Sequence, residues 1–242
     1  MFHKYTFLLF ALYCLCSDGV LSNSLLAPCK IEDAACIQKS VQAAAPKIIT
    51  GIPELGIESS DPLFLERIEG DLSILKYKFF NTTITGYKDC QISNIIISPD
   101  LTNVHFELNC PTLKMSGLYD INGRLIILPV EGNGDFFLTT GKYNILVDSE
   151  LKIQPGTDGK SHLSIKNFKL KCTAKSPIIF DFRNLFNGQK DLSDAVHKFA
   201  NESWDEVSKL VQDPVFYACM NKIIKHVNKY LKTVPLEDFK LN

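Results

Sequence analysis

Apolar and polar residues alternate between Tyr143 and Gln154, and this alternation constrains the fold more than any other feature of the sequence. One parity carries Tyr143, Ile145, Val147, Ser149, Leu151 and Ile153, and the other carries Asn144, Asp148, Glu150, Lys152 and Gln154. Because successive side chains of a strand point to opposite faces, the pattern predicts one long strand with a single wet face. At ~3.4 Å per residue it would be roughly 35 Å long, about twice the usual length, so we expect a long, curved sheet.

The same two-residue period holds over residues 68–182 and predicts further antiparallel strands. Asn122-Gly123 lies between two alternating segments and suits a two-residue type I′ hairpin turn. Gly132-Asn133-Gly134 is expected to form a bend between strands. Within residues 163–172 the apolar parity switches, as an extra bulge residue near Asn167 would cause, and bulges let long sheets bend.

A second hairpin can be tested against the cysteines, because a turn centred on Asp100 aligns two apolar segments. The predicted pairs are Ile96 with Val104, Asn94 with Phe106, Ile92 with Leu108, and Cys90 with Cys110. This register places both cysteines on the inner face and predicts a cross-strand disulfide. The alternative is two separate buried thiols.

Helical periodicity replaces the two-residue period at both ends of the chain. Ile31–Ile49 places apolar side chains at helical spacing and stops before Gly51. Near the C-terminus, Asp191 can cap an amphipathic helix. Asp213-Pro214 is expected to open another helix, which Pro235 ends.

The last predicted helix has an apolar stripe and a lysine-bearing face. The stripe includes Phe216, Ile223 and Val227, and the lysines are Lys222, Lys225, Lys229 and Lys232. We interpret the lysines as a solvated helix face, with a membrane-surface patch as the alternative.

The first residues indicate the compartment. Lys4 precedes an apolar run from Phe7 to Cys16, which small residues follow, as in a signal peptide. A membrane anchor is the alternative, but the run is shorter than the ~20 apolar residues that span a bilayer. We predict a signal peptide at residues 1–22 and one domain at residues 23–242. The mature chain would be secreted into an extracellular fluid, without stable membrane insertion.

Cysteines and asparagines agree with secretion. Of the 8 cysteines, Cys14 and Cys16 fall in the predicted signal peptide, so six remain, an even number in an oxidising compartment. Cys29 and Cys36 are near enough in sequence to close a small loop, which leaves Cys172 to pair with Cys219 and staple the last helix to the sheet. N-glycosylation sequons begin at Asn81 and Asn201.

Charge and motifs argue against several function classes. A net charge of −1 gives no indication of nucleic acid binding. The sequence has no HExxH, GxSxG or CxxC motif, no phosphate-binding loop and no dinucleotide-binding glycine pattern. His197 and His226 are expected on separate helices, as surface or helix-end residues rather than parts of a metal site or triad. We therefore expect no catalysis, no cofactor and no metal.

The apolar faces of the sheet and of the last helix are expected to enclose either a ligand tunnel or a filled core. Periodicity does not separate these alternatives. The candidate ligand-binding residues are Phe106, Tyr119, Tyr143, Ile145 and Val147 on strands, and Phe216, Ile223 and Val227 on the last helix.

Short motifs spread over the whole mature chain carry a family resemblance. They are Leu26-Ala27-Pro28-Cys29 with Cys36, Gly51-Ile52-Pro53, Asp61-Pro62-Leu63, Thr85-Gly86-Tyr87, Gly132-Asn133-Gly134, Asn184-Leu185-Phe186-Asn187-Gly188 and Asn201-Glu202-Ser203-Trp204. In order and spacing they resemble the takeout and juvenile-hormone-binding protein family of insects, within the tubular lipid-binding superfamily. The resemblance implies an α+β fold in which a long curved antiparallel sheet wraps a long C-terminal helix, with a short N-terminal helix. It also implies a tunnel for terpenoid or fatty-acid-like ligands.

The resemblance further implies a secreted, monomeric carrier that takes up a small hydrophobic ligand and makes or breaks no bond. Tyr143 could give its hydroxyl to the ligand's polar end, as similarity to hormone carriers implies, and a core or rim tyrosine is the alternative. Hormone carriers are similar in a disulfide placed as Cys172 and Cys219 would be, whereas Cys90 and Cys110 depart from both branches.

The helix motif favours the takeout-like branch, and the resemblance leaves the physiological role open among hormone transport, feeding, circadian rhythm and chemosensation. Two functions of other classes are alternatives: a module that binds membrane or microbial lipid surfaces, and a secreted lipid-ester hydrolase.

Overall fold

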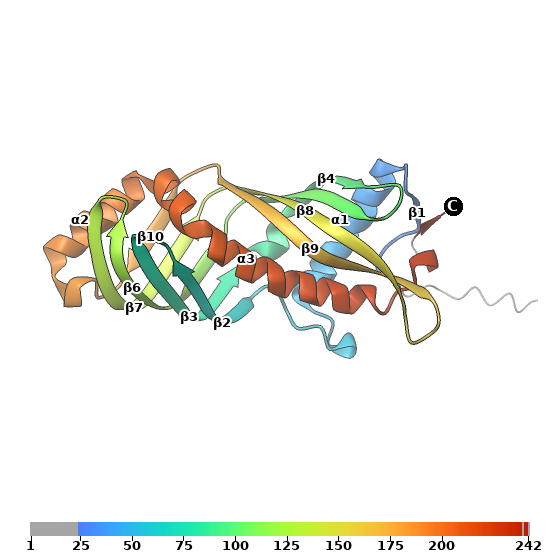
Figure 1. The fold of residues 1–242 in the computed structure, drawn as a ribbon, viewed down its shortest axis with the longest axis horizontal. Coiled ribbons are helices and arrows are strands. Elements are labelled where there is room, and N and C mark those ends of the chain that lie inside the picture. Colours follow the sequence, from blue (N-terminus) through green and yellow to red (C-terminus); the bar gives the residue numbers. More distant parts are fainter. Residues whose placement is uncertain (1–23, 239, 242) are drawn as a thin grey trace, which may run out of the picture.

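The computed structural model describes residues 24–238 and 240–241. The predicted signal peptide, residues 1–22, lies outside the described residues. The molecule is elongated, with a five-stranded sheet towards one end, a four-stranded sheet towards the other, and one long helix that runs along both (Figure 1). Both of these sheets are antiparallel, which confirms the predicted α+β fold, although the strands are divided between two sheets.

Most of the strands belong to the two antiparallel sheets. The five-stranded sheet has the order β10-β7-β6-β3-β2 and consists of β2 (Leu63–Asp71), β3 (Leu75–Thr85), β6 (Lys114–Leu125), β7 (Leu128–Thr140) and β10 (Ile178–Phe182). The four-stranded sheet has the order β4-β5-β8-β9 and consists of β4 (Gln91–Ile97), β5 (Asn103–Cys110), β8 (Tyr143–Pro155) and β9 (Ser161–Ala174). A short parallel pair joins β1 (Cys29–Lys30) to β11 (Lys240–Leu241). The helices are α1 (Ala34–Thr50), α2 (Lys190–Glu202) and α3 (Trp204–Leu231), with short 3-10 turns η1 (Pro53–Leu55), η2 (Tyr87–Asp89), η3 (Phe186–Gly188) and η4 (Leu236–Asp238).

Helix α1 confirms the predicted N-terminal helix. Its N-cap is Asp33, whose carboxylate accepts a hydrogen bond from the Cys36 amide at 2.9 Å. The buried face carries Ile37, Ala44 and Ile48, and this face turns towards the four-stranded sheet.

Helix α3 runs on through Pro214, so the predicted start of a new helix at Asp213-Pro214 is wrong. The break between the two C-terminal helices falls at Ser203 instead, and Asp191 lies in the first turn of α2 rather than capping it. Proline removes one helical hydrogen bond. The helix nevertheless continues, because packing of the apolar face supplies most of a helix's stability. Val207 before Pro214 and Phe216 after it are both buried.

The predicted turn at Asn122-Gly123 is also wrong. Both residues lie inside β6, and the hairpin turns at residues 126–127. Gly123 has a φ of +136°, and a Cβ there would lie 2.3 Å from the Ile74 carbonyl oxygen. This glycine therefore admits the β2–β3 connection, whose Ile74 carbonyl accepts a hydrogen bond from the Arg124 amide at 2.8 Å.

Gly132-Asn133-Gly134 lies within β7 and is not a bend between strands. A Cβ on Gly134 would lie 2.6 Å from the Arg183 carbonyl oxygen, so the glycines leave room for the segment that follows β10. The Tyr119 hydroxyl donates to that same carbonyl at 2.7 Å.

The β4–β5 hairpin follows the predicted register only at its cysteine end. Ile92 pairs with Leu108, and Cys90 and Cys110 form the predicted disulfide. Nearer the turn, a bulge between Ser93 and Ile96 shifts the register by one residue, so the predicted pairs of Ile96 with Val104 and Asn94 with Phe106 are wrong. Ile97 pairs with Val104 instead. The bulge buries Ile95 against α1 and leaves Ile96 65% exposed.

Strand β8 confirms the predicted long strand. Tyr143, Ile145, Val147 and Ser149 are buried on its inner face. The predicted bulge is present too, because Lys166 and Asn167 together face Glu150. Beyond the bulge, Ile153 is 42% exposed, so the inner face ends there.

The predicted Cys172–Cys219 disulfide is absent from the structure, whereas Cys29 is bonded to Cys36 as predicted. Cys172 on β9 and Cys219 on α3 are free thiols on two contacting elements. Burial raises the pKa of each thiol to about 12. Both are therefore protonated at neutral pH, and the thiolate is the form that enters disulfide exchange.

Candidate functional site: two apolar chambers under α3

The inner faces of the two sheets enclose two cavities, both covered by α3. The α2 chamber lies between the five-stranded sheet, α2 and the first half of α3. The α1 chamber lies between the four-stranded sheet, α1 and the second half of α3. The cavity volumes are about 110 Å³ for the α2 chamber and about 260 Å³ for the α1 chamber.

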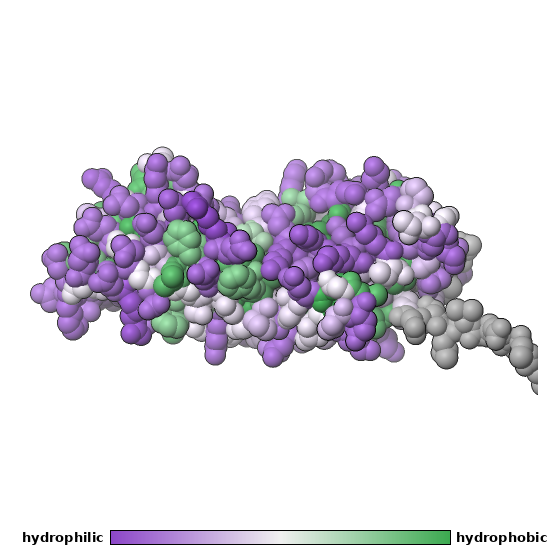
Figure 2. Space-filling model, turned by 90° about the horizontal axis from the view of Figure 1, so that it is seen from below, coloured by the Kyte–Doolittle hydropathy of each residue, from purple (hydrophilic) through white to green (hydrophobic). Residues whose placement is uncertain are grey.

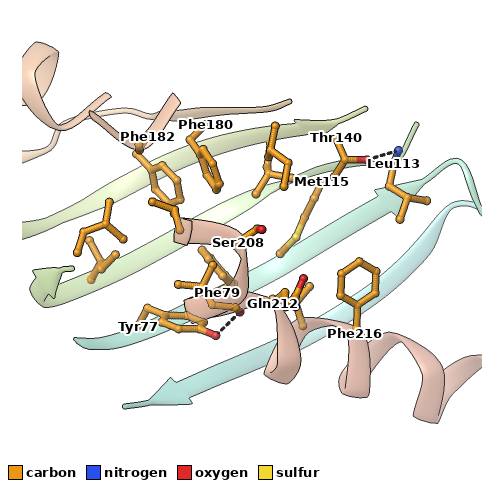
Figure 3. Close-up of a pocket in the computed structure, with 18 of the residues that line it drawn as sticks. Tyr77, Phe79, Leu113, Met115, Thr140, Phe180, Phe182, Ser208, Gln212 and Phe216 are labelled. Carbon is orange, nitrogen blue, oxygen red and sulfur yellow. Dashed lines mark hydrogen bonds between the residues drawn. The ribbon is translucent and has the colours of Figure 1, made fainter. Parts of the chain in front are cut away.

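Aromatic and aliphatic side chains dominate the walls of the α2 chamber. Figure 3 shows side chains from the strands and from α3 turned towards the same space, among them Phe79, Met115, Phe180, Phe182 and Phe216. Several of their rings contact one another, as in the tilted pair of Tyr77 and Phe79 with centroids 5.2 Å apart. The five-stranded sheet therefore contributes a continuous apolar surface to this chamber.

Polar groups on the α2 chamber's walls bond to the protein itself. The Thr140 hydroxyl accepts a hydrogen bond from the Leu113 amide at 2.9 Å, as drawn in Figure 3. The Tyr77 hydroxyl donates to the Val211 carbonyl at 2.7 Å, and the His197 Nε2 atom accepts from the Phe182 amide at 2.9 Å. Such groups are satisfied without a ligand, so the chamber presents mainly carbon.

Tyr143 belongs to this wall, and its hydroxyl donates to the Gln212 side-chain oxygen. Gln212 in turn donates to the Cys172 carbonyl at 3.1 Å. Burial raises the pKa of Tyr143, so the phenol stays neutral. In the structure this hydroxyl ties β8 to α3 and is not directed at open space.

The α1 chamber has walls of similar character but a different polar edge. Ile37, Val41 and Ala44 of α1 face Phe106 and Leu108 across it, and α3 supplies Ile223, Ile224 and Val227. The Ser40 hydroxyl accepts from the Ala27 amide at 2.8 Å, and the Tyr230 hydroxyl accepts from the Leu25 amide at 2.6 Å. Two lysines, Lys88 and half-buried Lys240, also reach the wall. The chamber is thus apolar, with positive charge at its edge.

Figure 2 shows one face of the outer surface, where hydrophilic side chains predominate and smaller apolar areas lie between them. The chamber walls, in contrast, consist mainly of apolar side chains. No helix in the described part of the chain combines the length and apolar character needed to cross a bilayer.

Five of the eight predicted ligand-binding residues lie on chamber walls. Tyr143 and Phe216 line the α2 chamber, and Phe106, Ile223 and Val227 line the α1 chamber. The other three, Tyr119, Ile145 and Val147, are buried in the packed core.

The wall residues that were not predicted from the sequence include the inner face of α1, the aromatic residues of β10, and Tyr87. The helical spacing of Ile37, Val41 and Ala44 was a usable signal for the first group, since the apolar face of a helix packs against another apolar surface. No local pattern distinguishes Tyr87, which lines both chambers.

Two pairs of a serine hydroxyl and a histidine ring occur among the described residues. On α2, Ser193 Oγ and His197 Nδ1 lie 3.3 Å apart, but Nδ1 also bonds to the Ser193 carbonyl at 2.8 Å and Nε2 accepts from the Phe182 amide, so neither ring nitrogen is open to act as a base. The other pair lies outside the chambers. Ser60 Oγ and His226 Nδ1 lie 2.8 Å apart, and His226 Nε2 lies 4.0 Å from Glu58. Ser60 is 0% exposed, and neither it nor His226 is among the wall residues. The pair therefore has no access to a chamber-bound ligand. Within the described residues, no group of three or more His, Cys, Asp or Glu side chains could hold a metal ion.

Comparison with known proteins gives consistent matches over nearly the whole chain. Residues 7–240 match the family described as Haemolymph juvenile hormone binding protein (JHBP). The circadian clock-controlled protein daywake of Drosophila melanogaster is 26% identical over 230 residues, which cover 89% of this chain and 87% of that protein. Daywake of Drosophila yakuba is 26% identical over 232 residues, with the same coverage of 89% and 87%.

Among solved structures, Takeout 1 of Epiphyas postvittana is similar in fold and sequence. It superposes with a TM-score of 0.85 at 29% identity, and the match covers 90% of this chain and 100% of that one. Together with the two-chambered interior, these matches show that the chain belongs to the insect takeout and haemolymph juvenile hormone binding protein family.

Proposed function

We propose that this protein is a secreted, monomeric carrier that takes one small hydrophobic molecule into the α1 chamber. The observation that carries the proposal is the chamber itself, about 260 Å³ of space inside apolar walls. A cavity of about 150 Å³ lined by apolar side chains stays dry and can hold a benzene ring. The α1 chamber therefore has room for a larger apolar ligand.

Desolvation would supply most of the affinity. Burying apolar surface contributes about 25 cal/mol per Å². Since Ser40 and Tyr230 already bond to backbone amides, their hydroxyls would add little polar attraction. The walls therefore favour molecules made almost entirely of carbon and hydrogen, such as terpenoids and fatty-acid-like chains.

Lys240 suggests where the ligand's polar end would lie. It is the half-buried lysine on the α1 chamber's wall, on strand β11 opposite Cys29. An ammonium group at the edge of an apolar cavity can bond to a carboxylate or ester oxygen. We therefore propose a ligand with one acidic or hydrogen-bond-accepting end and an apolar body.

Secretion is proposed on three grounds. Residues 1–22 have the pattern of a signal peptide, two disulfides are present, and Asn81, the first residue of a sequon, is exposed. A link to circadian rhythm is proposed on similarity to the daywake proteins alone.

Two observations disfavour binding to a lipid surface through the lysines of α3. The Lys222 ammonium donates to the Phe64 carbonyl at 2.9 Å, and the Lys229 ammonium donates to the Gly56 carbonyl at 2.8 Å. These lysines hold the segments around η1 and β2 against the helix, so they are engaged within the molecule.

A matched pair of substitutions on α3 tests the proposal. Val227 and Val215 are both half-buried, and they line the α1 chamber and the α2 chamber respectively. Val227→Trp would fill the α1 chamber and abolish binding of a short fluorescent fatty-acid analogue. Val215→Trp would leave binding of the same analogue near the wild-type level. Equal loss in both variants, or no binding by the wild type, would overturn the proposal.

A further inference from the structure

We infer that Tyr87 is the partition between the two chambers and sets the longest ligand that the α1 chamber accepts. The inference rests on the proposed carrier function and adds a specificity-determining residue to it. Among the described residues, Tyr87 is the one that lines both chambers.

Tyr87 lies where the chain passes from one sheet to the other. It opens η2, between β3 of the five-stranded sheet and β4 of the four-stranded sheet. Its side chain is 5% exposed, and its hydroxyl lies close to the Cys219 thiol on α3. Cys219 lines the α2 chamber and the next residue, Met220, lines the α1 chamber. The phenol therefore meets α3 at the boundary between the two cavities.

The backbone around Tyr87 is held on both sides by one carboxylate. Asp61 Oδ2 accepts hydrogen bonds from the Gly86 amide at 3.0 Å and from the Lys88 amide at 2.8 Å. Gly86 has a φ of +112°, and a Cβ there would lie 2.2 Å from the Thr112 carbonyl oxygen, so only glycine fits.

A disulfide bond restrains the chain shortly after Tyr87. The Cys90 amide donates to the Tyr87 carbonyl at 3.1 Å, and Cys90 is bonded to Cys110. With its backbone fixed in this way, the tyrosine can leave the boundary only by a change of its side-chain rotamer. That change would move the phenol away from Cys219 and require space among close-packed neighbours.

A straight apolar chain that fills the α1 chamber would meet the Tyr87 ring at its inner end. Each further methylene group would then press on a well-packed wall, and one methylene too many in an apolar pocket typically changes affinity by about 10- to 200-fold. The wild type should therefore show a sharp upper limit of chain length. Removing the ring should join the two chambers and move the limit to longer chains.

The test uses the full secreted protein and a series of straight-chain fatty acids from octanoate to docosanoate. Kd is measured for each acid by displacement of a fluorescent analogue. We expect wild-type affinity to rise with chain length and then fall at least tenfold, and we expect Tyr87→Ala to bind the longest acids at least tenfold more tightly than the wild type does. Tyr87→Phe, which keeps the ring and loses the hydroxyl, should have the same upper limit of chain length as the wild type.

A double variant identifies the space that the longer chain enters. In the Tyr87→Ala background, Val215→Trp fills the α2 chamber and should abolish the gain for long acids while short acids still bind. Tyr87→Leu keeps an apolar side chain without a ring, so it serves the same test should the alanine variant fold poorly.

Failure of the carrier function and failure of the partition give different binding results. Binding of no acid by the wild type overturns the carrier function and the partition with it. Binding with the same length limit in the wild type, Tyr87→Ala and Tyr87→Leu overturns the partition alone, as does an equal affinity of the wild type for short and long acids.

Discussion

The side-chain amide of Asn201 on α2 brackets the backbone of Phe180 on β10. Its Oδ1 atom accepts from the Phe180 amide at 2.8 Å, and its Nδ2 atom donates to the Phe180 carbonyl at 3.4 Å. Strand β10 is an edge strand of the five-stranded sheet, and Asn201 occupies part of its open hydrogen-bonding edge. A residue that the sequence marks as a glycan acceptor thus has a structural role.

This relationship predicts glycosylation at Asn81 and not at Asn201. Asn81 is exposed on β3, whereas a glycan on the Asn201 nitrogen would compete with its bond to Phe180. Intact mass measurement of protein secreted from insect cells should show one glycan, which Asn81→Gln removes. A glycan that persists in Asn81→Gln would contradict the prediction.

The same bonds predict a stability difference between the two asparagines. Asn201→Ala should lower the free energy of unfolding by about 1–3 kcal/mol, because two backbone groups of β10 lose their partner. Asn81→Asp, at an exposed site whose φ of +47° suits asparagine and aspartate, should change it by less than about 0.5 kcal/mol when both proteins are deglycosylated. Urea unfolding compares the two, and equal effects would speak against the structural role of Asn201.

The free thiols of Cys172 and Cys219 give a second prediction. Burial raises both pKa values to about 12, so neither thiol should react with a thiol reagent at neutral pH while the protein is folded. On denaturation, both should react. If the denatured, unreduced protein shows no reactive thiol, the two cysteines are paired after all, as the sequence analysis expected.

The acid sensitivity of folding should depend on His226. Burial, and next the positive charge of Lys222, lowers its pKa in the folded state. As the pH falls through about 6.5, His226 becomes protonated in the unfolded state but stays neutral in the folded state. The free energy of unfolding therefore decreases with falling pH until the folded-state pKa is passed.

Substitution tests this contribution. His226→Gln removes the titrating ring and should be less stable than the wild type at about pH 7.5, but the difference in Tm should narrow at about pH 5. Thermal melts at the two pH values measure the change. A difference that widens on acidification would show that the folded-state pKa is not lowered.

The sequence predicted those parts of the fold that depend on side-chain parity. Tyr143 to Ser149 alternate inward and outward because one face of β8 is buried, and the parity switch near Asn167 marks a bulge that the structure contains. Ile92, Leu108 and the disulfide of Cys90 and Cys110 follow from the same reasoning.

The errors share a different physical cause. Gly123, Gly134 and Pro214 have strong local preferences, but each has a role set by a segment distant in sequence. Gly123 meets the Ile74 carbonyl, Gly134 meets that of Arg183, and α3 continues past Pro214 because both halves pack on the sheets. The division of the interior into two chambers was beyond prediction for the same reason, because Tyr87 becomes a wall residue of both only when two sheets and α3 meet around it.

Lys240 provides the most direct test of the ligand's chemistry. If its ammonium group bonds to an acidic end, Lys240→Met should weaken binding of a fatty acid by about tenfold, equivalent to ~1.4 kcal/mol, and hardly affect the corresponding methyl ester. Lys225→Met is the matched control, because Lys225 is exposed on α3 and is not among the wall residues of either chamber. It removes the same charge from the molecule without touching the α1 chamber.

Displacement titrations with the acid and its ester, on both variants and the wild type, distinguish three cases. A loss confined to the acid and to Lys240→Met supports a charged contact at the chamber edge. Equal loss for acid and ester indicates that Lys240 acts through the packing of its aliphatic stem. An equal loss in Lys225→Met would instead indicate a long-range effect of net charge, which added salt should screen.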